Sequence, residues 1–347
     1  MKKIAGMIHF ETGGSPWARG WRNAEVCREL GLRWFESALR SCDNADRRER
    51  SSAMRWMEQT ASVLPEMAEE MEGIAAGLGV EWEDYVLASF AGRLRVAAVD
   101  CSTFGAWTPE GRAVVGKTDD ILPGQRGMNV LQSVRPDKGH AHVKIHFGGT
   151  VGVSSGMNSE GLVVALTGIP GPEVEGLGIP NLWLADLLLR VCGTVAEAIE
   201  AARRTPLSFY GCSLLLADRG DGMALIEKNA LATKVLPPME GGFFAHTNHI
   251  LDPELEAASP RQSEELHANS HARQRLLRDL LPSAVPASVP NFERLLSQRN
   301  EHAAVWQTGD DVLHTDYAII ASPAEVGFRL FTACPGTAAP EDILVPE

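Results

Sequence analysis

AVDCSTFGAW, residues 98–107, carries an apolar run into an alternating segment that is typical of a β-strand, with Cys101 near its start. The tight-turn signature Pro109-Glu110-Gly111 follows. The predicted structure is a β-hairpin whose second strand returns Lys117 and Asp120 toward Cys101. A thiol, a cation and a carboxylate from adjacent strands would form a candidate catalytic group.

Composition limits the classes of function that the chain can have. Its 347 residues, 44% hydrophobic, are enough to bury one large core or two smaller ones. The formal net charge of −13 argues against nucleic acid, because binding phosphates requires a basic face. No apolar stretch approaches the length of a membrane span, and the apolar start ends at His9 and Glu11, too early for a signal peptide. We therefore expect a soluble, cytoplasmic protein.

The six cysteines form no CxxC pair, and we expect free thiols in a reducing compartment. Five of them lie in apolar or helical settings, where a small buried hydrophobic residue is the simpler interpretation. Cys101 differs because of its neighbours.

Helical patterns come first along the chain and strands follow, which predicts an α+β layered fold. Residues 1–90 are predicted to be mostly helical, and the hairpin at Asp218–Gly222 is predicted from its turn residues. The predicted strands are 96–107, 113–117, 142–147, 162–167, 212–217, 224–228, 243–246, 317–322 and 327–333, and the predicted helices after the first ninety residues are 180–192, 195–204, with Thr194 as its cap, and 272–281.

A histidine-rich segment raises the question of a metal. On a strand, His140, His142 and His146 would share one face, as zinc ligands could. Lys144 would lie on that same face, and no acidic or cysteine ligand is near in sequence. A solvent-facing or partly buried polar face is the favoured interpretation, so we expect no metal and no cofactor.

Two further motifs end or begin strands. In FFAHTNH, residues 243–249, an apolar strand ends in polar groups, which is common at the edge of a cleft, although such groups also satisfy their own turn. GMNSEGL, residues 156–162, is a turn that leads into the apolar run ending at Thr167.

Taken together, these motifs resemble the acyl-coenzyme A:isopenicillin N acyltransferase family, cysteine members of the N-terminal nucleophile hydrolases. The resemblance covers about residues 70–335, and residues 72–77, before the cysteine, are a secondary match. It rests on the order and spacing of the motifs more than on any single motif. It implies a four-layer αββα sandwich, made as a precursor that cuts itself before the nucleophile. Relatives include conjugated bile salt hydrolases and penicillin V acylases, which act on linear amide bonds.

Carried over by position, the resemblance implies that Cys101 is the nucleophile, with self-cleavage between Asp100 and Cys101. It makes Asp120 the carboxylate that holds the nucleophile and Asn248 a side-chain donor to the oxyanion. Thr167 lies near a further donor. Lys117 stands where arginine is usual and lacks its two-pronged grip on a carboxylate, and Asp100 stands where glycine is common.

The chemistry explains why these residue types suit the task. An N-terminal cysteine carries its own base, because an α-amine has a pKa of about 7.7–8.0. Attack on an amide gives an oxyanion that needs fixed donors, and then an acyl-cysteine that water or an amine resolves. The expected partner is a small amide or acyl donor, with acyl-coenzyme A as one candidate. Residues 1–100 and 101–347 are expected to stay associated as one unit.

Two alternatives remain open. One is a papain-like enzyme in which His246 or His249 is the base for Cys101 and no self-cleavage occurs. The other is a non-catalytic binding protein on the same fold, with an unprocessed Cys101. The mass of the denatured protein would separate the self-cleaving enzyme from both alternatives.

Overall fold

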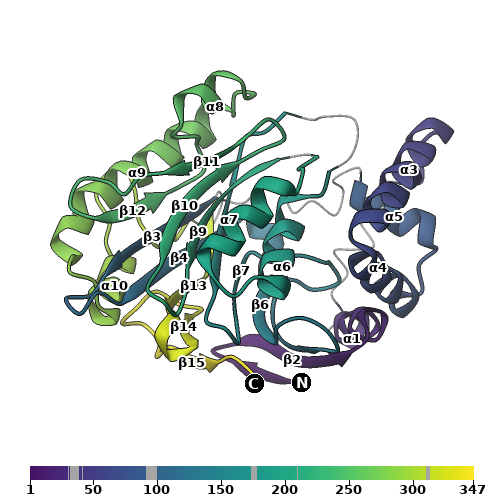
Figure 1. Ribbon diagram of the computed structural model, residues 1–347, viewed down its shortest axis with the longest axis horizontal. Helices are drawn as coiled ribbons and strands as arrows, with labels where there is room; N and C mark the ends of the chain where they lie inside the picture. Colours follow the sequence, from purple (N-terminus) through teal and green to yellow (C-terminus); the bar gives the residue numbers. More distant parts are fainter. Residues whose placement is uncertain are drawn as a thin grey trace.

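The computed structural model describes residues 1–29, 31, 39–40, 42–90, 100–172, 178–208, 210–309 and 313–347. Two β-sheets pack face to face between two groups of helices, which confirms the predicted α+β sandwich (Figure 1). Residues 96–99 of the first predicted strand lie outside the described part.

The larger sheet has nine strands, and their order brings distant segments of the chain together. β2 pairs with β5 in parallel, whereas the other neighbouring strands pair antiparallel. In spatial order the strands are β1 (Lys2–Ile4), β2 (Met7–Gly14), β5 (Asn129–Pro136), β6 (His142–Phe147), β7 (Ser155–Asn158), β8 (Val163–Ile169), β9 (Gly211–Ala217), β10 (Met223–Lys228) and β11 (Thr233–Leu236).

The smaller sheet has six strands and carries the predicted hairpin near its edge. Its strands are β12 (Phe243–His246), β3 (Cys101–Trp107), β4 (Ala113–Ile121), β13 (His314–Ser322), β14 (Gly327–Phe331) and β15 (Glu341–Leu344), with short 3₁₀ turns at Pro123–Gln125 and Pro323–Glu325. β3 and β4 pair antiparallel, with Cys101 opposite Asp119, so the hairpin is confirmed.

Alternating residues divide each sheet between two cores. Between the sheets, Val115 and Tyr317 of the smaller sheet pack against Leu215 of the larger one. The outer face of the larger sheet is covered by α1 (Pro16–Glu29), α3 (Arg47–Val63), α4 (Pro65–Leu78), α5 (Trp82–Phe90), α6 (Asn181–Val191) and α7 (Val195–Arg204). The outer face of the smaller sheet packs against α9 (Glu264–Ala284) and α10 (Val289–Leu296), with α8 (Pro253–Ala257) before them.

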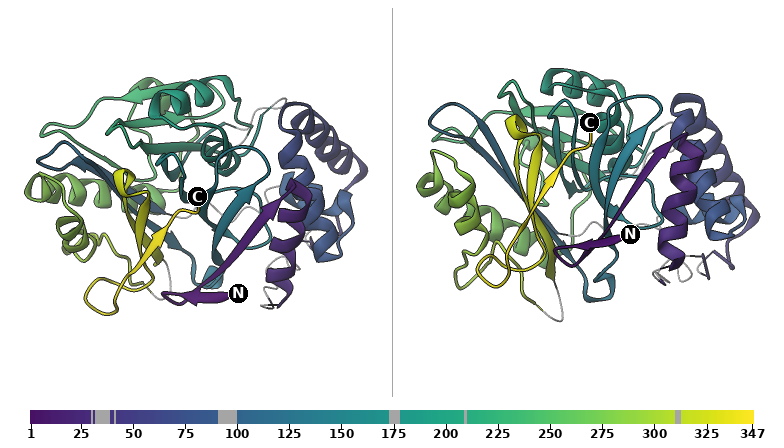
Figure 2. Two further views of the ribbon diagram at one scale, coloured as in Figure 1. Left: turned by 60° about the horizontal axis from the view of Figure 1, so that its bottom comes forward. Right: turned by 90° about the horizontal axis from the view of Figure 1, so that it is seen from below.

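The described part of residues 1–90 is mostly helical, as predicted, but the chain starts with two strands that the sequence analysis missed. β1 and β2 form the edge of the larger sheet, and β2 leads into α1 (Figure 2). The reason is that Phe10 on β2 is buried against Val26 of α1 and Val130 of β5. The helix predicted over 272–281 begins earlier, because α9 starts at Glu264 and the short α8 precedes it.

Candidate active site

Cys101 is the first residue of β3, and its side chain points into the layer between the two sheets, where it is 4% exposed. Its thiol donates a hydrogen bond to Asp119 Oδ1 at 3.2 Å. Burial raises the pKa of this thiol well above its usual value, although the positive charge of Lys117 acts in the opposite direction. The thiolate therefore needs a nearby proton acceptor to form.

Lys117 belongs to the same buried group, as the hairpin prediction required. Its ammonium donates to Asp119 Oδ1 at 3.0 Å and to the carbonyl oxygen of Ser154 at 3.0 Å, and it lies 3.5 Å from the hydroxyl of Tyr317. Burial alone would lower the pKa of Lys117, but the carboxylate of Asp119 outweighs it and the pKa is raised. Lys117 is therefore held as a cation beside the thiol.

Asp120 lies on the opposite face of β4 from Asp119, because neighbouring residues of a strand alternate. Its carboxylate accepts a hydrogen bond from Thr315 Oγ1 at 2.5 Å, and its backbone N–H donates to the carbonyl oxygen of Asp100 at 2.7 Å. Burial raises the pKa of Asp120 to about 7, against the opposing charge of Arg273. The side chain thus faces α9, and the backbone holds the carbonyl of the bond that precedes Cys101.

Asn248, two residues after β12, reaches the nitrogen of Cys101. Its Oδ1 accepts hydrogen bonds from the backbone N–H of Cys101 at 2.8 Å and from Arg273 at 3.0 Å. Its Nδ2 donates one hydrogen to the carbonyl oxygen of Gly168 at 3.0 Å. The fold therefore places this amide beside the residue that the sequence marked as nucleophile.

Arg273 of α9 is a site residue that the sequence reasoning missed. Its guanidinium donates to the carbonyl oxygen of Cys101 at 2.6 Å and to Ser102 Oγ at 3.0 Å, and it pairs with the Asp100 carboxylate at 3.2 Å. It is 1% exposed, although it lies on a helix rich in charged residues. The only sequence signal is its spacing, four residues before the buried Leu277, which places it on the inward face of α9.

Thr167, on β8 of the facing sheet, is buried and bonds His246 Nδ1 at 3.3 Å. His246 also bonds Glu227 Oε1 through Nε2 at 2.7 Å, and His249 bonds Ser270 Oγ at 2.8 Å. Both imidazoles, the candidate bases of a papain-like arrangement, thus have partners of their own. Burial, reinforced by His271, lowers the pKa of His249 to about 3.

The histidine-rich segment presents a mostly buried face: His140 stays partly exposed, whereas His142 and His146 are buried, so the expectation of a partly buried polar face holds and that of a solvent-facing one does not. His142 and His146 lie on β6 with Lys144 between them and face the helical layer, because Lys144 pairs with Asp186 of α6 at 2.8 Å. Their Nδ1 atoms bond the carbonyl oxygens of His140 at 2.9 Å and Phe147 at 2.8 Å. Among the described residues, no group of side chains fits a metal ion.

A family comparison adds to this geometry. Residues 107–334 match the family of acyl-coenzyme A:6-aminopenicillanic acid acyl-transferases, and this match covers well over half of the chain. The chain belongs to this acyl-transferase family. The resemblance inferred from the motifs is thereby confirmed. The matched region contains Lys117, Asp120, Thr167 and Asn248 and begins just after Cys101.

Solved structures with similarity to this acyl-transferase family member share low sequence identity with it. They include a mutant of conjugated bile acid hydrolase from Clostridium perfringens, 13% identical, covering 70% of this chain and 92% of its own, with a TM-score of 0.45. An N-acylethanolamine-hydrolyzing acid amidase ortholog from Caenorhabditis elegans is 15% identical and covers 65% and 93%, with a TM-score of 0.43. A penicillin V acylase from Agrobacterium tumefaciens is 16% identical and covers 70% and 84%, with a TM-score of 0.38. No curated protein matches the sequence.

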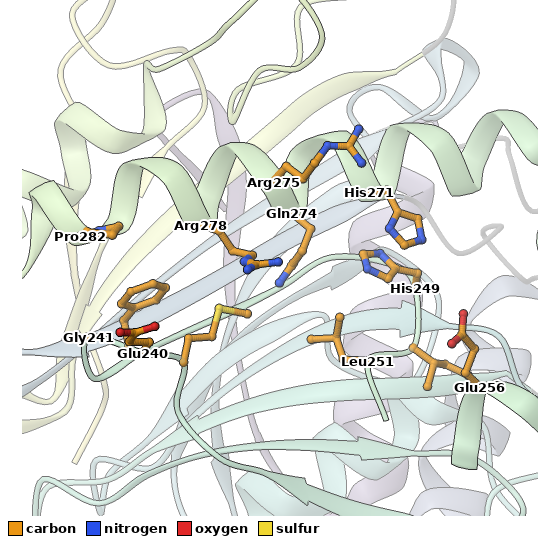
Figure 3. A pocket seen from close by; sticks show the side chains of 13 residues that line it. Glu240, Gly241, His249, Leu251, Glu256, His271, Gln274, Arg275, Arg278 and Pro282 are labelled. Carbon is orange, nitrogen blue, oxygen red and sulfur yellow. The ribbon is translucent and has the colours of Figure 1, made fainter. Parts of the chain in front are cut away.

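A cleft of about 790 Å³ lies between α9 and the segment that follows β12. Figure 3 shows His271, Gln274 and Arg278 of α9 on one side of it and His249 facing His271, with the two rings 3.7 Å apart. One of its lining residues, His249, follows Asn248 directly in the sequence.

Among the described residues of the chain, no helix combines the length and apolar character that crossing a bilayer requires.

Proposed function

We propose that this acyl-transferase family member is a self-processing cysteine enzyme that breaks a linear carbon–nitrogen amide bond through an acyl-cysteine. The observation that carries the proposal is the pair of contacts around the Asp100–Cys101 peptide. Asp120 N–H bonds the Asp100 carbonyl oxygen at 2.7 Å, and Asn248 Oδ1 accepts the Cys101 N–H at 2.8 Å. Both ends of this peptide group are thus held beside the thiol.

After cleavage, the nitrogen of Cys101 becomes an α-amine. Asn248 Oδ1 is placed to keep that amine where the amide N–H now lies, next to its own thiol. With a pKa near 8, this amine takes the thiol proton at working pH. The hydrogen bonds of His246 to Glu227 and of His249 to Ser270 support the amine as base in place of an imidazole.

The remaining residues have roles in the tetrahedral intermediate. The second amide hydrogen of Asn248 is proposed as an oxyanion donor, and Thr167 as a further donor from β8. Lys117 supplies positive charge beside the developing thiolate. Collapse of the intermediate releases the amine of the substrate, and water or a second amine then resolves the acyl-cysteine.

The substrate proposed here is a small amide or acyl donor, with acyl-coenzyme A as one candidate donor. Residues 1–100 and 101–347 are proposed to stay associated after cleavage. β2 supports this, because it pairs along its length with β5 of the second fragment.

The test is the mass of the denatured protein. Wild type should give two fragments that meet between Asp100 and Cys101, and Cys101→Ala should give one intact chain. Cys334→Ala, a substitution of another cysteine, is the matched control and should be cleaved like wild type. An intact wild type that still hydrolyses amides would overturn the self-processing mechanism and favour the papain-like one.

A further inference from the structure

Self-cleavage needs a base that the mature enzyme does not need. Before cleavage the nitrogen of Cys101 is a peptide amide whose N–H is donated to Asn248, so it cannot accept the thiol proton. We propose that Asp119 is the base that removes the thiol proton of Cys101 during self-cleavage. This inference rests on the proposed function and assigns a separate catalytic residue to its first step.

Asp119 is in contact with the reacting atom. Cys101 lies opposite Asp119 across the β3–β4 pair, and its Sγ donates to Asp119 Oδ1 at 3.2 Å. The other carboxylate oxygen, Oδ2, is buried and has no hydrogen-bond partner among the described residues. The side chain is only 2% exposed, so water competes little for either oxygen. A base within hydrogen-bond reach of the proton it abstracts meets the geometric requirement for catalysis.

The neighbours of Asp119 fix its position and balance its charge. Ser154 Oγ donates to Oδ1 at 2.8 Å, and Lys117 donates to the same oxygen at 3.0 Å. When the proton moves from Sγ to Asp119, the negative charge moves from the carboxylate to the thiolate. The ammonium of Lys117 lies beside both groups, so the net charge of the buried group does not change when the proton moves.

Self-cleavage of the Asp100–Cys101 bond requires no reactant other than water. The thiolate attacks the carbonyl carbon of Asp100, forming a C–S bond, and the oxyanion accepts the N–H of Asp120 that already lies 2.7 Å from this oxygen. The C–N bond then breaks, and the proton held by Asp119 passes to the departing nitrogen of Cys101. Water hydrolyses the resulting thioester. This releases the backbone α-carboxylate of Asp100, which ends the first fragment, and regenerates the thiol of Cys101.

The experiment follows cleavage of freshly synthesised full-length chain by mass over time. Asp119→Asn should slow the appearance of fragment 101–347 by about 10²-fold or more, the usual contribution of a general base. Asp119→Glu, which keeps a carboxylate, should recover part of the rate. Asp279→Asn, on the exposed part of α9, is the matched control and should be cleaved at the wild-type rate. Cleavage of Asp119→Asn at the wild-type rate would overturn the proposal.

Hydroxylamine separates formation of the thioester from its hydrolysis, because it cleaves thioesters directly. It should not restore cleavage of Asp119→Asn, since the thioester fails to form without the base. Restoration to the wild-type rate would show that Asp119 acts only after thioester formation, and would overturn the proposal.

A measurement on wild type covers the case in which the variants do not fold. With a fixed side chain as the base, the cleavage rate should rise far less than tenfold per pH unit between about pH 6 and pH 8. A thiolate formed by hydroxide would instead make the rate rise about tenfold per pH unit, and this result would overturn the proposal. A wild type that is never cleaved would overturn the proposed function as well, whereas cleavage independent of Asp119 would overturn only this inference.

Discussion

At the scale of single residues, two adjacent aspartates have separate surroundings. Asp119 faces the thiol of Cys101 and the ammonium of Lys117, between the sheets. Asp120 faces Thr315 and α9, and its neighbours include the carboxylate of Asp100 and the guanidinium of Arg273. The resemblance pointed to Asp120, and its backbone N–H, not its carboxylate, bonds the Asp100 carbonyl oxygen. One strand thus presents a carboxylate to the nucleophile on one face and a second carboxylate to the scissile bond region on the other.

The pKa of Asp120, raised by burial to about 7, predicts a pH-dependent stability. Between its unfolded pKa near 4 and about pH 7, the folded chain binds this proton and the unfolded chain does not, so stability falls as pH rises through that window. Asp120→Asn, compared in the uncleaved Cys101→Ala chain, should remove this loss. The variant should gain on the order of 2 kcal/mol in unfolding free energy relative to its parent between about pH 5 and pH 8.

Urea unfolding of the parent chain and of Asp120→Asn at about pH 5 and about pH 8 measures this difference in unfolding free energy. Asp279→Asn in the same background is the control, since an exposed carboxylate should leave the pH dependence as it was. A parent chain whose stability rises between these two pH values relative to Asp120→Asn would show that Asp120 is ionised and stabilising when folded, contrary to this expectation.

At the scale of elements, the sequence predicts what depends on local signals. The β3–β4 hairpin was predicted from its turn residues and from the alternation of apolar and polar residues. The helix α7 was predicted with Thr194 as its cap, and in the structure Thr194 accepts the N–H of Glu197. Contacts that cross between elements were not predictable. Arg273 reaches Cys101 only because α9 packs across the smaller sheet, and β2 is a strand because it pairs with β5, which lies far along the chain.

The contact between α1 and α4 depends on glycine. A Cβ added to Gly73 would lie 2.1 Å from the carbonyl oxygen of Trp17, and one added to Gly20 would lie 1.9 Å from that of Glu70. The clashing atoms are backbone, so no side-chain rotation relieves them. The two helices therefore approach as closely as they do because these positions lack side chains.

Gly73→Ala should consequently lower the unfolding free energy by about 2 kcal/mol, because α1 must shift away from α4. A decrease in unfolding free energy is informative, because alanine in a helix interior is otherwise more stable than glycine by about 1 kcal/mol. Gly124→Ala is the matched control: its added Cβ would meet nothing within 4 Å, and its effect should stay within about 0.5 kcal/mol. Chemical denaturation of both variants decides the point, and a stabilised Gly73→Ala would contradict the close approach of the helices.

At the scale of the whole molecule, a buried ion cluster joins the two proposed fragments. Glu70 of α4 belongs to residues 1–100 and is 1% exposed. It pairs with Arg19 of α1 at 3.2 Å, with Arg190 of α6, and with Lys144 of β6 at 3.7 Å. Asp186 of α6 completes the cluster by accepting from Lys144 at 2.8 Å. Of the cations that Glu70 meets, Arg190 and Lys144 lie in the second fragment.

Glu70→Gln should therefore weaken both the fold and the association of the fragments. Removing one carboxylate leaves buried cations without enough negative charge, which costs about 3–5 kcal/mol. In the uncleaved Cys101→Ala chain the loss should appear as a lower unfolding free energy in urea. In cleaved protein it should also appear as release of residues 1–100 on gel filtration at low concentration, because no peptide bond then tethers them.

Glu72→Gln, on the exposed side of the same helix, removes the same charge and is the matched control. It should change the unfolding free energy by no more than about 0.5 kcal/mol and leave the fragments together. The uncleaved Glu70→Gln chain should elute as one species at the same concentration, because its segments remain covalently joined. If cleaved Glu70→Gln kept its fragments together at every dilution and unfolded at the same urea concentration as its parent, strand pairing between β2 and β5 would be sufficient for association, and the cluster would not be what holds the fragments together.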